Sequence, residues 1–235
     1  MQVISSPAEI SDPLPVHRKM DFFPPAEHAG GMADSSGKGA ALFATHSKIT
    51  PAERAHQNGH PGCVVWLTGL SAAGKSTLAV ELERELFRAG RQVFVLDGDN
   101  LRHGLCSDLG FSPDAREENI RRVAEVAKLF AEAGIICITA FISPYRAGRD
   151  LARRITPPGQ FLEVYLSTPL AACEHRDPKG LYARARAGKL PDFTGISAPY
   201  EAPLNPEIEL RTDQLAIGEC VARILERLNA LQAPG

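Results

Sequence analysis

The feature that most constrains the fold of this 235-residue chain is the octapeptide GLSAAGKS at positions 69–76. It matches the P-loop pattern G-x-x-x-x-G-K-[ST] at every fixed position, between an apolar run at 63–67 and a helical pattern at 77–89. The two glycines allow a tight turn whose N–H groups point at a phosphate, and the following helix adds its positive end. The alternative, a glycine turn that binds nothing, does not require this order of strand, loop and helix, so we predict a nucleoside triphosphate site.

Each part of this loop has an expected role. We expect the backbone to surround the phosphates, Lys75 to reach the β- and γ-phosphates, and the Ser76 hydroxyl to ligate Mg²⁺. The predicted triphosphate-binding residues of the loop are Gly69, Leu70, Ser71, Ala72, Ala73, Gly74, Lys75, Ser76 and Thr77.

Charge and cysteine content limit the partners and the compartment. A formal net charge of -2 argues against non-specific nucleic-acid binding, because no overall basic field exists to neutralise a phosphate backbone. The five cysteines are scattered and lack a C-x-x-C pair, which indicates core positions in a reducing compartment. The start of the chain does not resemble a signal peptide, and no segment is long enough to span a bilayer. We therefore expect a cytoplasmic protein without nucleic-acid or membrane partners.

The order of the predicted elements indicates an α/β fold. Residues 1–45 are rich in Pro, Gly, Ser and Ala without apolar periodicity, which predicts a disordered tail before a domain at 46–235. We expect strands at 63–67, 93–96, 135–141, 161–166 and 208–210, a short helix that opens at Pro51, and further helices at 77–89, 113–133, 147–155, 168–190 and the C-terminus. This alternation predicts the P-loop kinase fold, a three-layer arrangement in which helices cover both faces of a parallel sheet, with ligands at the carboxyl ends of the strands.

Charged and polar side chains follow the second predicted strand. Asp97 and Asp99 come directly after it, where carboxylates are able to hold Mg²⁺ through water and to accept a proton from an attacking hydroxyl. The alternative is that D-G-D is only a turn. Arg116 and Asn119 lie at i, i+3 near the start of the next helix, where an arginine is unfavourable for the helix dipole and an anionic partner is a reasonable explanation. A solvated surface charge is the alternative for Arg116.

Together these motifs resemble those of the adenylylsulfate kinase (APS kinase) family. Six separated blocks carry the likeness over about 46–235, namely GLSAAGKST at 69–77, DGDNLR at 97–102, GFS and R-x-ENIRR at 110–122, FISPYR at 141–146, RDPKGLY at 176–182, and FTG with PYEAP at 193–203. The resemblance implies transfer of the ATP γ-phosphoryl group to the 3′-hydroxyl of adenosine 5′-phosphosulfate (APS), which gives 3′-phosphoadenylyl sulfate (PAPS) and ADP in sulfate activation.

The resemblance also implies roles for individual residues. Asp99 is expected to act as the base or to orient the hydroxyl, with Asp97 and Ser76 at Mg²⁺, and the division of labour between the two aspartates stays open. Phe111 and Phe193 are expected to clasp the adenine of the acceptor, with core packing as the alternative for each. The predicted APS-binding residues are Asp99, Arg102, Phe111, Arg116, Asn119, Ile142, Ser143 and Phe193.

Ser143 is the position that the family associates with a phosphoserine. We expect direct transfer instead, because no base is evident beside it in the sequence, and a helix cap or a backbone contact is the alternative role. The predicted catalytic residues are Asp99, Lys75 and Ser143. The P-loop also departs from the family in having Ala72 where glycine is common, at a variable position that tolerates alanine.

The basic segment at about 176–195 resembles the family's mobile lid. Arg176 and Lys179 are expected to bind the ATP phosphates when the lid closes and excludes water. A solvated basic helix is the alternative.

Two other kinds of function stay open. One is a different small-molecule P-loop kinase, for a nucleoside or a sugar acid, against which the 111–119 block argues. The other is a non-catalytic nucleotide-binding module, or a partner subunit of a sulfate-activating complex. A GTPase is disfavoured because the chain has no N-K-x-D motif. Similar enzymes are usually dimers, so we expect a homodimer, and an association with ATP sulfurylase stays open.

Overall fold

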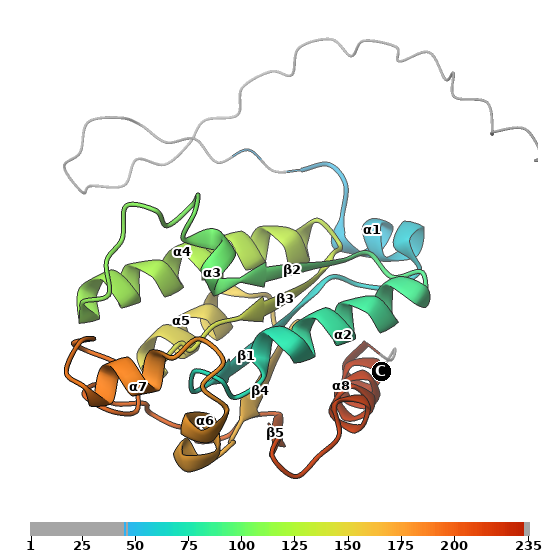
Figure 1. The fold of residues 1–235 in the computed structure, drawn as a ribbon. Coiled ribbons are helices and arrows are strands. Elements are labelled where there is room, and N and C mark those ends of the chain that lie inside the picture. The colour runs from blue at the N-terminus through green and yellow to red at the C-terminus, as the bar shows by residue number, and fades with distance from the viewer. Residues whose placement is uncertain (1–44, 46, 233–235) are drawn as a thin grey trace, which may run out of the picture. The chain divides into compact units, whose positions relative to one another are not determined.

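Five parallel strands form the centre of the fold. They are β1 (Cys63–Gly69), β2 (Val93–Asp97), β3 (Ile136–Ala140), β4 (Phe161–Leu166) and β5 (Ile208–Leu210). The computed structural model describes residues 45 and 47–232 and arranges the strands in the order β2-β3-β1-β4-β5 (Figure 1). All five strands were predicted from the sequence, with ends that differ by two residues or fewer. The predicted disordered tail lies outside the described residues, apart from residue 45.

Helices connect the strands. Those of the described residues are α1 (Pro51–Asn58), α2 (Lys75–Arg88), α3 (Gly98–Leu101), α4 (Pro113–Glu132), α5 (Arg146–Ile155), α6 (Leu170–Arg176), α7 (Leu181–Arg186) and α8 (Ile217–Gln232). Helix α1 begins with a capping box, in which Thr50 and Glu53 satisfy each other's backbone N–H groups. Helix α4 begins with Pro113 after Ser112, whose hydroxyl accepts from the N–H of Ala115. Both starts were predicted from the sequence.

Two local features differ from the sequence prediction. The stretch at 168–190 forms two helices, α6 and α7, because Asp177 leaves the helical conformation. The Asp177 carboxylate then accepts from the N–H groups of Tyr182 and Ala183 at 3.1 and 3.0 Å, in the first turn of α7. Helix α3 was not predicted at all, and Asp97 caps it by accepting from the N–H of Asp99 at 3.0 Å. The D-G-D sequence is therefore a helix start and more than a turn.

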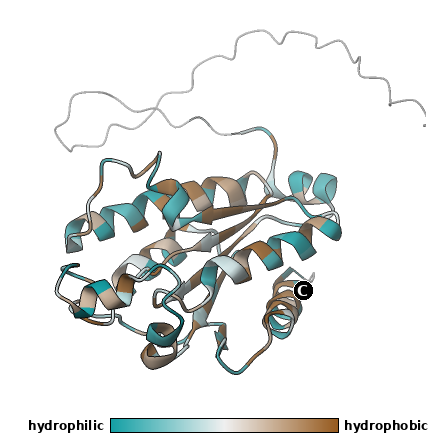
Figure 2. Cartoon of the chain, in the orientation of Figure 1, coloured by the Kyte–Doolittle hydropathy of each residue, from teal (hydrophilic) through white to brown (hydrophobic). Residues whose placement is uncertain are grey.

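The sheet is covered by helices on both faces, as the alternating pattern predicted. Side chains of β1 point alternately to the two sides, with Val65 and Leu67 in a core shared with α2 and α8, and Val64 and Trp66 in a core shared with α4 and α5. Every residue of β1 and β3 is buried, as expected for central strands of a parallel sheet. Figure 2 shows the apolar residues concentrated on the strands and on the inner sides of these helices.

The topology brings two loops together at the carboxyl ends of the strands. Strand β3 lies between β1 and β2, so the P-loop after β1 and helix α3 after β2 meet across the end of β3. The P-loop itself packs close to β4, since a Cβ at Gly69 would lie 2.7 Å from the Leu166 carbonyl oxygen, which only glycine avoids. All five cysteines are free and buried, as predicted. Among the described residues, no helix has the length and apolar content that a membrane crossing needs.

Candidate active site

A cavity of about 1180 Å³ opens at the carboxyl ends of the strands. Its volume lies slightly above the range of roughly 300–1,000 Å³ that is usual for small-molecule pockets. The predicted site residues that line it are Ser71, Ala72, Gly74, Lys75, Ser76, Thr77, Asp97, Asp99, Arg102, Phe111, Arg116, Asn119, Ile142, Ser143, Arg176, Lys179 and Phe193. Only Gly69, Leu70 and Ala73 of the predicted set lie outside its lining.

Lys75 is held inside the P-loop, at the first residue of α2. The side chain is buried, and its Nζ donates to the carbonyl oxygens of Gly69 and Leu70 at 2.9 and 2.6 Å. Burial lowers the pKa of Lys75 from 10.5 to about 8, because removal from water disfavours the charged form. A bound phosphate would replace the two carbonyl acceptors with negatively charged oxygens. These oxygens would favour the protonated amine and raise the pKa of Lys75.

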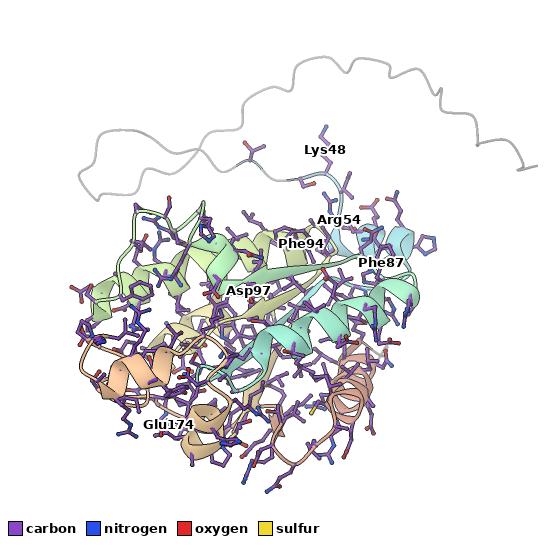
Figure 3. All side chains as sticks on the ribbon, in the orientation of Figure 1. Lys48, Arg54, Phe87, Phe94, Asp97 and Glu174 are labelled. Atoms are coloured by element: carbon purple, nitrogen blue, oxygen red, sulfur yellow. The ribbon has the colours of Figure 1, made fainter. Side chains whose placement is uncertain are left out.

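The serine of the loop contacts the first of the two predicted aspartates. Ser76 Oγ donates to Asp97 Oδ2 at 2.7 Å, while Oδ1 of the same carboxylate caps α3. Figure 3 shows Asp97 at the end of β2. The hydroxyl and carboxylate oxygens are the hard ligands that suit Mg²⁺, which proteins commonly hold through one or two side chains, waters and substrate phosphates. In the described part of the chain no group of three acidic, histidine or cysteine residues is placed to hold a metal ion, and this hydroxyl–carboxylate pair would need waters and substrate phosphates to complete a site.

The second aspartate forms an ion pair with the basic segment. Lys179 lies between α6 and α7, and its Nζ pairs with Asp99 Oδ2. Both side chains are largely exposed, so the pair contributes little to stability. Its significance is geometric, because it brings the predicted lid lysine to the carboxylate that is predicted to act on the acceptor.

Arg176 connects the P-loop to Thr212, which follows β5. Its guanidinium donates to the hydroxyl and the carbonyl oxygen of Thr212 at 2.9 and 2.6 Å, and to the carbonyl oxygen of Ala72 at 3.3 Å. Thr212 Oγ1 in turn donates to the carbonyl oxygen of Ala73 at 2.8 Å. Ala72 has φ 58°, in the left-handed region that favours glycine. Thr212 was not predicted, since a single threonine after a strand carries no sequence signal for this contact.

The second half of the cavity is formed around Phe111, which is 60% exposed and therefore not a core residue. The Arg102 guanidinium lies 4.1 Å from the centre of its ring. Arg116 donates to the carbonyl oxygen of Phe111 at 2.9 Å and to that of Asp192 at 2.7 Å, and burial lowers its pKa. Arg116 is therefore not a free surface charge, because it joins the start of α4 to the segment that carries Phe193.

Two polar side chains of this half each have an unsatisfied buried atom. Among the described residues, Asn119 Oδ1 and Thr194 Oγ1 have no hydrogen-bond partner, and both residues belong to the cavity lining with exposed fractions of 5% and 2%. An unsatisfied buried polar group costs about 1–3 kcal/mol, so a ligand that formed a hydrogen bond with either atom would relieve that cost. Phe193 packs edge-on against Tyr182, with ring centres 5.1 Å apart, and also lines the cavity. Asn119 and Phe193 were predicted from the sequence as site residues, whereas Thr194 was not.

Ser143 is a buried part of the cavity wall. Its hydroxyl accepts from Trp66 Nε1 at 3.2 Å and donates to Thr68 Oγ1 at 2.9 Å, and the residue is 2% exposed. Its φ of 40° is unusual for a residue other than glycine. The hydroxyl is thus engaged within the protein, and residues 142–144 form part of the cavity lining.

Comparisons with known proteins agree with this geometry. The family model described as adenylylsulphate kinase matches residues 61–211. An adenylyl-sulfate kinase of Shewanella amazonensis is 57% identical over 77% of this chain and 91% of its own length. An adenylyl-sulfate kinase of Staphylococcus haemolyticus is 56% identical over 77% of this chain and 92% of its own length.

Solved structures give the same result. The APS kinase CysC of Mycobacterium tuberculosis, in complex with AMPPNP and APS, has a TM-score of 0.69 and 46% identity, and the match covers 72% of this chain and 99% of that one. A sugar kinase of Janibacter, at 20% identity and a TM-score of 0.53 over 74% of this chain and 100% of its own, shares the fold alone.

Proposed function

Since the chain belongs to the adenylylsulphate kinase family, we propose that it transfers the γ-phosphoryl group of ATP to the 3′-hydroxyl of APS, giving PAPS and ADP. The observation that carries the proposal is the position of α3 within one cavity. At its start Asp97 contacts Ser76 of the P-loop, and at its end Arg102 lies over Phe111. This single helical turn therefore connects a triphosphate-binding half to a half with aromatic and basic side chains.

At the donor end the P-loop binds the triphosphate. The backbone N–H groups at the start of α2 face the phosphates, and Lys75 exchanges its contacts with Gly69 and Leu70 for the β- and γ-phosphates. Ser76 and Asp97 would hold Mg²⁺, which neutralises charge on the transferred group when it is bound. In a loose transition state this positioning and neutralisation matter more than strong base chemistry.

At the acceptor end the side chains position APS. Asp99 orients the 3′-hydroxyl or takes its proton, and Phe111 and Phe193 stack on the adenine. Arg102 and Arg116 face the phosphosulfate and ribose. The unpartnered Asn119 Oδ1 and the backbone at 142–143 supply further polar contacts.

We propose that transfer is direct, without a phosphorylated Ser143. Direct in-line transfer needs no covalent stage, and the Ser143 hydroxyl is already engaged by Trp66 and Thr68 in a buried position. Its part in the reaction is then to fix the wall of the acceptor site.

The remaining assignments complete the proposal. We assign residues 46–235 to the kinase domain and about 176–195 to a lid, in which Lys179 moves from Asp99 to the ATP phosphates. Arg176, which contacts the P-loop at the Ala72 carbonyl oxygen, also binds the phosphates when the lid closes. We also propose a cytoplasmic homodimer that associates with ATP sulfurylase. A solved APS kinase of Thiobacillus denitrificans is described as hexameric, so an oligomer larger than a dimer is the competing assembly.

The test is a coupled assay of ADP formation that depends on both ATP and APS. We expect robust turnover with the intact chain, a loss of 10²-fold or more in Asp99→Ala, and near-normal turnover in Asp114→Ala, which removes an exposed aspartate outside the cavity. Gluconate and nucleosides replace APS in parallel assays. An intact chain that binds ATP but does not phosphorylate APS, whether or not it phosphorylates gluconate or a nucleoside, would falsify the proposal.

A further inference from the structure

A buried arginine, Arg149, lies on α5 behind the acceptor half of the cavity. It is 2% exposed, and it lines neither the large cavity nor the smaller one beside it. A cation is retained at such depth only where charge and hydrogen bonds compensate for the loss of water. Its partners therefore indicate what the residue does.

The guanidinium joins three separate parts of the fold. Nε donates to Glu163 Oε1 on β4 at 2.9 Å, Nη1 donates to the Ser143 carbonyl oxygen at 2.6 Å, and Nη2 donates to the Glu201 carbonyl oxygen at 2.6 Å. The planar fork of arginine supplies all three donors in fixed directions, which a lysine amine does not. Two of the three acceptors are backbone carbonyl groups from two segments: that of Ser143, which lines the large cavity, and that of Glu201, which lines the smaller one.

The first of these segments is the wall that follows β3. Ser143 holds φ 40°, a conformation that costs on the order of 1–3 kcal/mol and persists only where its surroundings enforce it. Trp66 and Thr68 hold the side chain of Ser143, and Arg149 holds its carbonyl group. The result is a fixed segment at 142–144, which lines the cavity.

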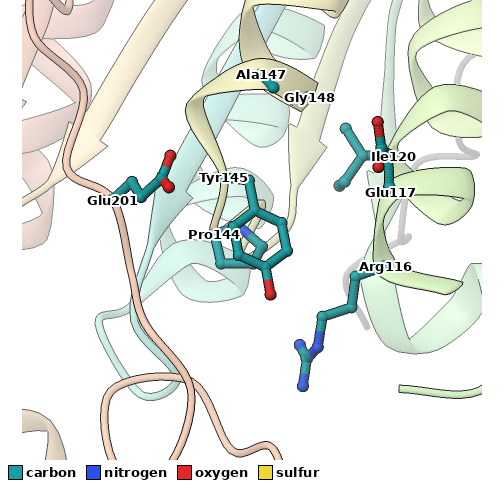
Figure 4. A pocket seen from close by; sticks show the side chains of 8 residues that line it. All are labelled: Arg116, Glu117, Ile120, Pro144, Tyr145, Ala147, Gly148 and Glu201. Carbon is teal, nitrogen blue, oxygen red and sulfur yellow. The ribbon is translucent and has the colours of Figure 1, made fainter. Parts of the chain in front are cut away.

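The second segment follows the residues that carry Phe193 and Thr194. Glu201 donates its N–H to the Pro144 carbonyl oxygen, and its carboxylate accepts from the N–H of Arg146, both at 2.8 Å. Figure 4 shows Glu201 and Arg116 on opposite sides of a cavity of about 260 Å³, with Pro144 and Tyr145 between them. Direct hydrogen bonds thus join this segment to residues 144 and 146, and Arg149 adds a third link that also connects both segments to Glu163 on β4.

We propose that Arg149 is a positioning residue for the acceptor: it fixes the wall of the APS pocket at 142–144 relative to β4 and to the segment at Glu201, and so tunes APS binding without touching APS. The inference rests on the proposed function, because it concerns the acceptor half of that site. The donor half is outside its reach, since Arg149 makes no contact with the P-loop among the described hydrogen bonds.

Arg153 supplies a matched control for the test, because it pairs with the same carboxylate as Arg149. Glu163 is also buried, and its second carboxylate oxygen accepts from Arg153 Nη2 at 3.3 Å. Arg153 otherwise pairs with Glu207 at 2.6 and 2.8 Å, and among the hydrogen bonds of the described residues it reaches neither Ser143 nor Glu201. Loss of Arg153 therefore disturbs the same ion-pair network without releasing either segment.

The experiment compares Arg149→Lys, Arg149→Gln and Arg153→Gln with the unchanged chain. Steady-state kinetics give KM for APS at saturating ATP and KM for ATP at saturating APS. Calorimetry measures the affinity for a non-hydrolysable ATP analogue, and thermal melting measures stability. We expect KM for APS to rise 10-fold or more in both Arg149 variants, with affinity for the ATP analogue within threefold. In Arg153→Gln we expect a lower melting temperature and both KM values within twofold.

A merely structural role predicts a different outcome. The inference is overturned if KM for APS stays within twofold in a folded Arg149→Lys. It is also overturned if the KM values for APS and ATP rise together in all three variants as the melting temperature falls. Arg149→Lys keeps the charge beside Glu163, so it serves as the test should Arg149→Gln not fold. Absence of APS turnover in the unchanged chain would instead contradict the proposed function, which separates the two failures.

Discussion

The Ser76 hydroxyl donates a hydrogen bond of 2.7 Å to Asp97 Oδ2, and this contact joins the first turn of α2 to the end of β2. Strand β3 lies between β1 and β2, so the two oxygens meet only because the P-loop and α3 both bend over the end of β3. Asp97 uses its other oxygen to cap α3. The candidate metal ligands are therefore held in place by the fold itself.

Replacing Asp97 with asparagine tests this pair as a metal site. Asparagine retains a side-chain oxygen for the cap of α3 but loses the negative charge, so we expect kcat to fall at least 10²-fold at ordinary Mg²⁺ concentrations and to recover partly at high Mg²⁺. Nucleotide affinity measured without Mg²⁺ should stay within threefold. A Mg²⁺ titration of kcat for Asp97→Asn beside Asp114→Asn makes the comparison, and an unchanged Mg²⁺ dependence would exclude Asp97 from the metal site.

Lys75 gives a prediction about stability and pH. Its pKa is lowered from 10.5 to about 8 by burial, so the unfolded chain binds this proton more tightly than the folded chain does. The cost to folding is therefore fully present below pH 8 and disappears as pH rises toward 10.5. We expect Lys75→Met to raise the free energy of unfolding by up to about 3 kcal/mol at pH 7, with a gain that shrinks over that window, while kinase activity is lost.

Urea unfolding of the nucleotide-free protein at pH 7 and pH 10 measures this effect. Lys48→Met, at an exposed lysine, is the control and should change stability by less than about 0.5 kcal/mol. A gain for Lys75→Met that is equal at both pH values would show that desolvation of the amine is not its cause.

The sequence predicted the fold closely because its signals are local. Buried parallel strands are continuous apolar runs, and α1 and α4 are announced by Thr50 and Ser112 before proline. The P-loop and the acidic pair follow strands directly, and parallel strands place their carboxyl ends together. The prediction failed within 168–190, where one helical pattern hides the break at Asp177.

The supporting contacts of the site were not predictable in the same way. Arg176 braces the P-loop through Thr212, 36 residues further along the chain, and Arg149 reaches Glu201, 52 residues further along. Neither partner carries a spacing signal, because tertiary contacts between loops depend on how those loops are arranged over the sheet. The sequence therefore shows that an arginine carries a positive charge, but only the structure shows whether its guanidinium binds a ligand or a carbonyl group of the protein.

Ala72 provides a prediction about backbone strain. It holds φ 58°, which costs an alanine roughly 1–2 kcal/mol, while glycine in its place adds about 0.4–1 kcal/mol of chain entropy to the unfolded state. We expect Ala72→Gly to raise the free energy of unfolding by up to about 1 kcal/mol and to keep kcat within threefold. Ala73→Gly should instead destabilise, because it removes a fully buried methyl group. Denaturant unfolding of both variants is the measurement, and equal losses would contradict the strain argument.

Ser143→Ala separates direct transfer from a phosphoserine stage. The variant removes the acceptor of Trp66 Nε1 and the donor to Thr68, so we expect it to lose about 1–2 kcal/mol of stability, and the fluorescence of this single tryptophan should report the lost contact. Because the substitution leaves the backbone at 142–144 in the cavity lining unchanged, we expect kcat within about tenfold of the unchanged chain, a small loss compared with the removal of a nucleophile. Rapid-quench turnover with radiolabelled ATP should then show no protein-bound phosphate in either form. A folded Ser143→Ala that binds both substrates but does not turn over, together with labelled Ser143 in the unchanged chain, would establish the covalent route instead.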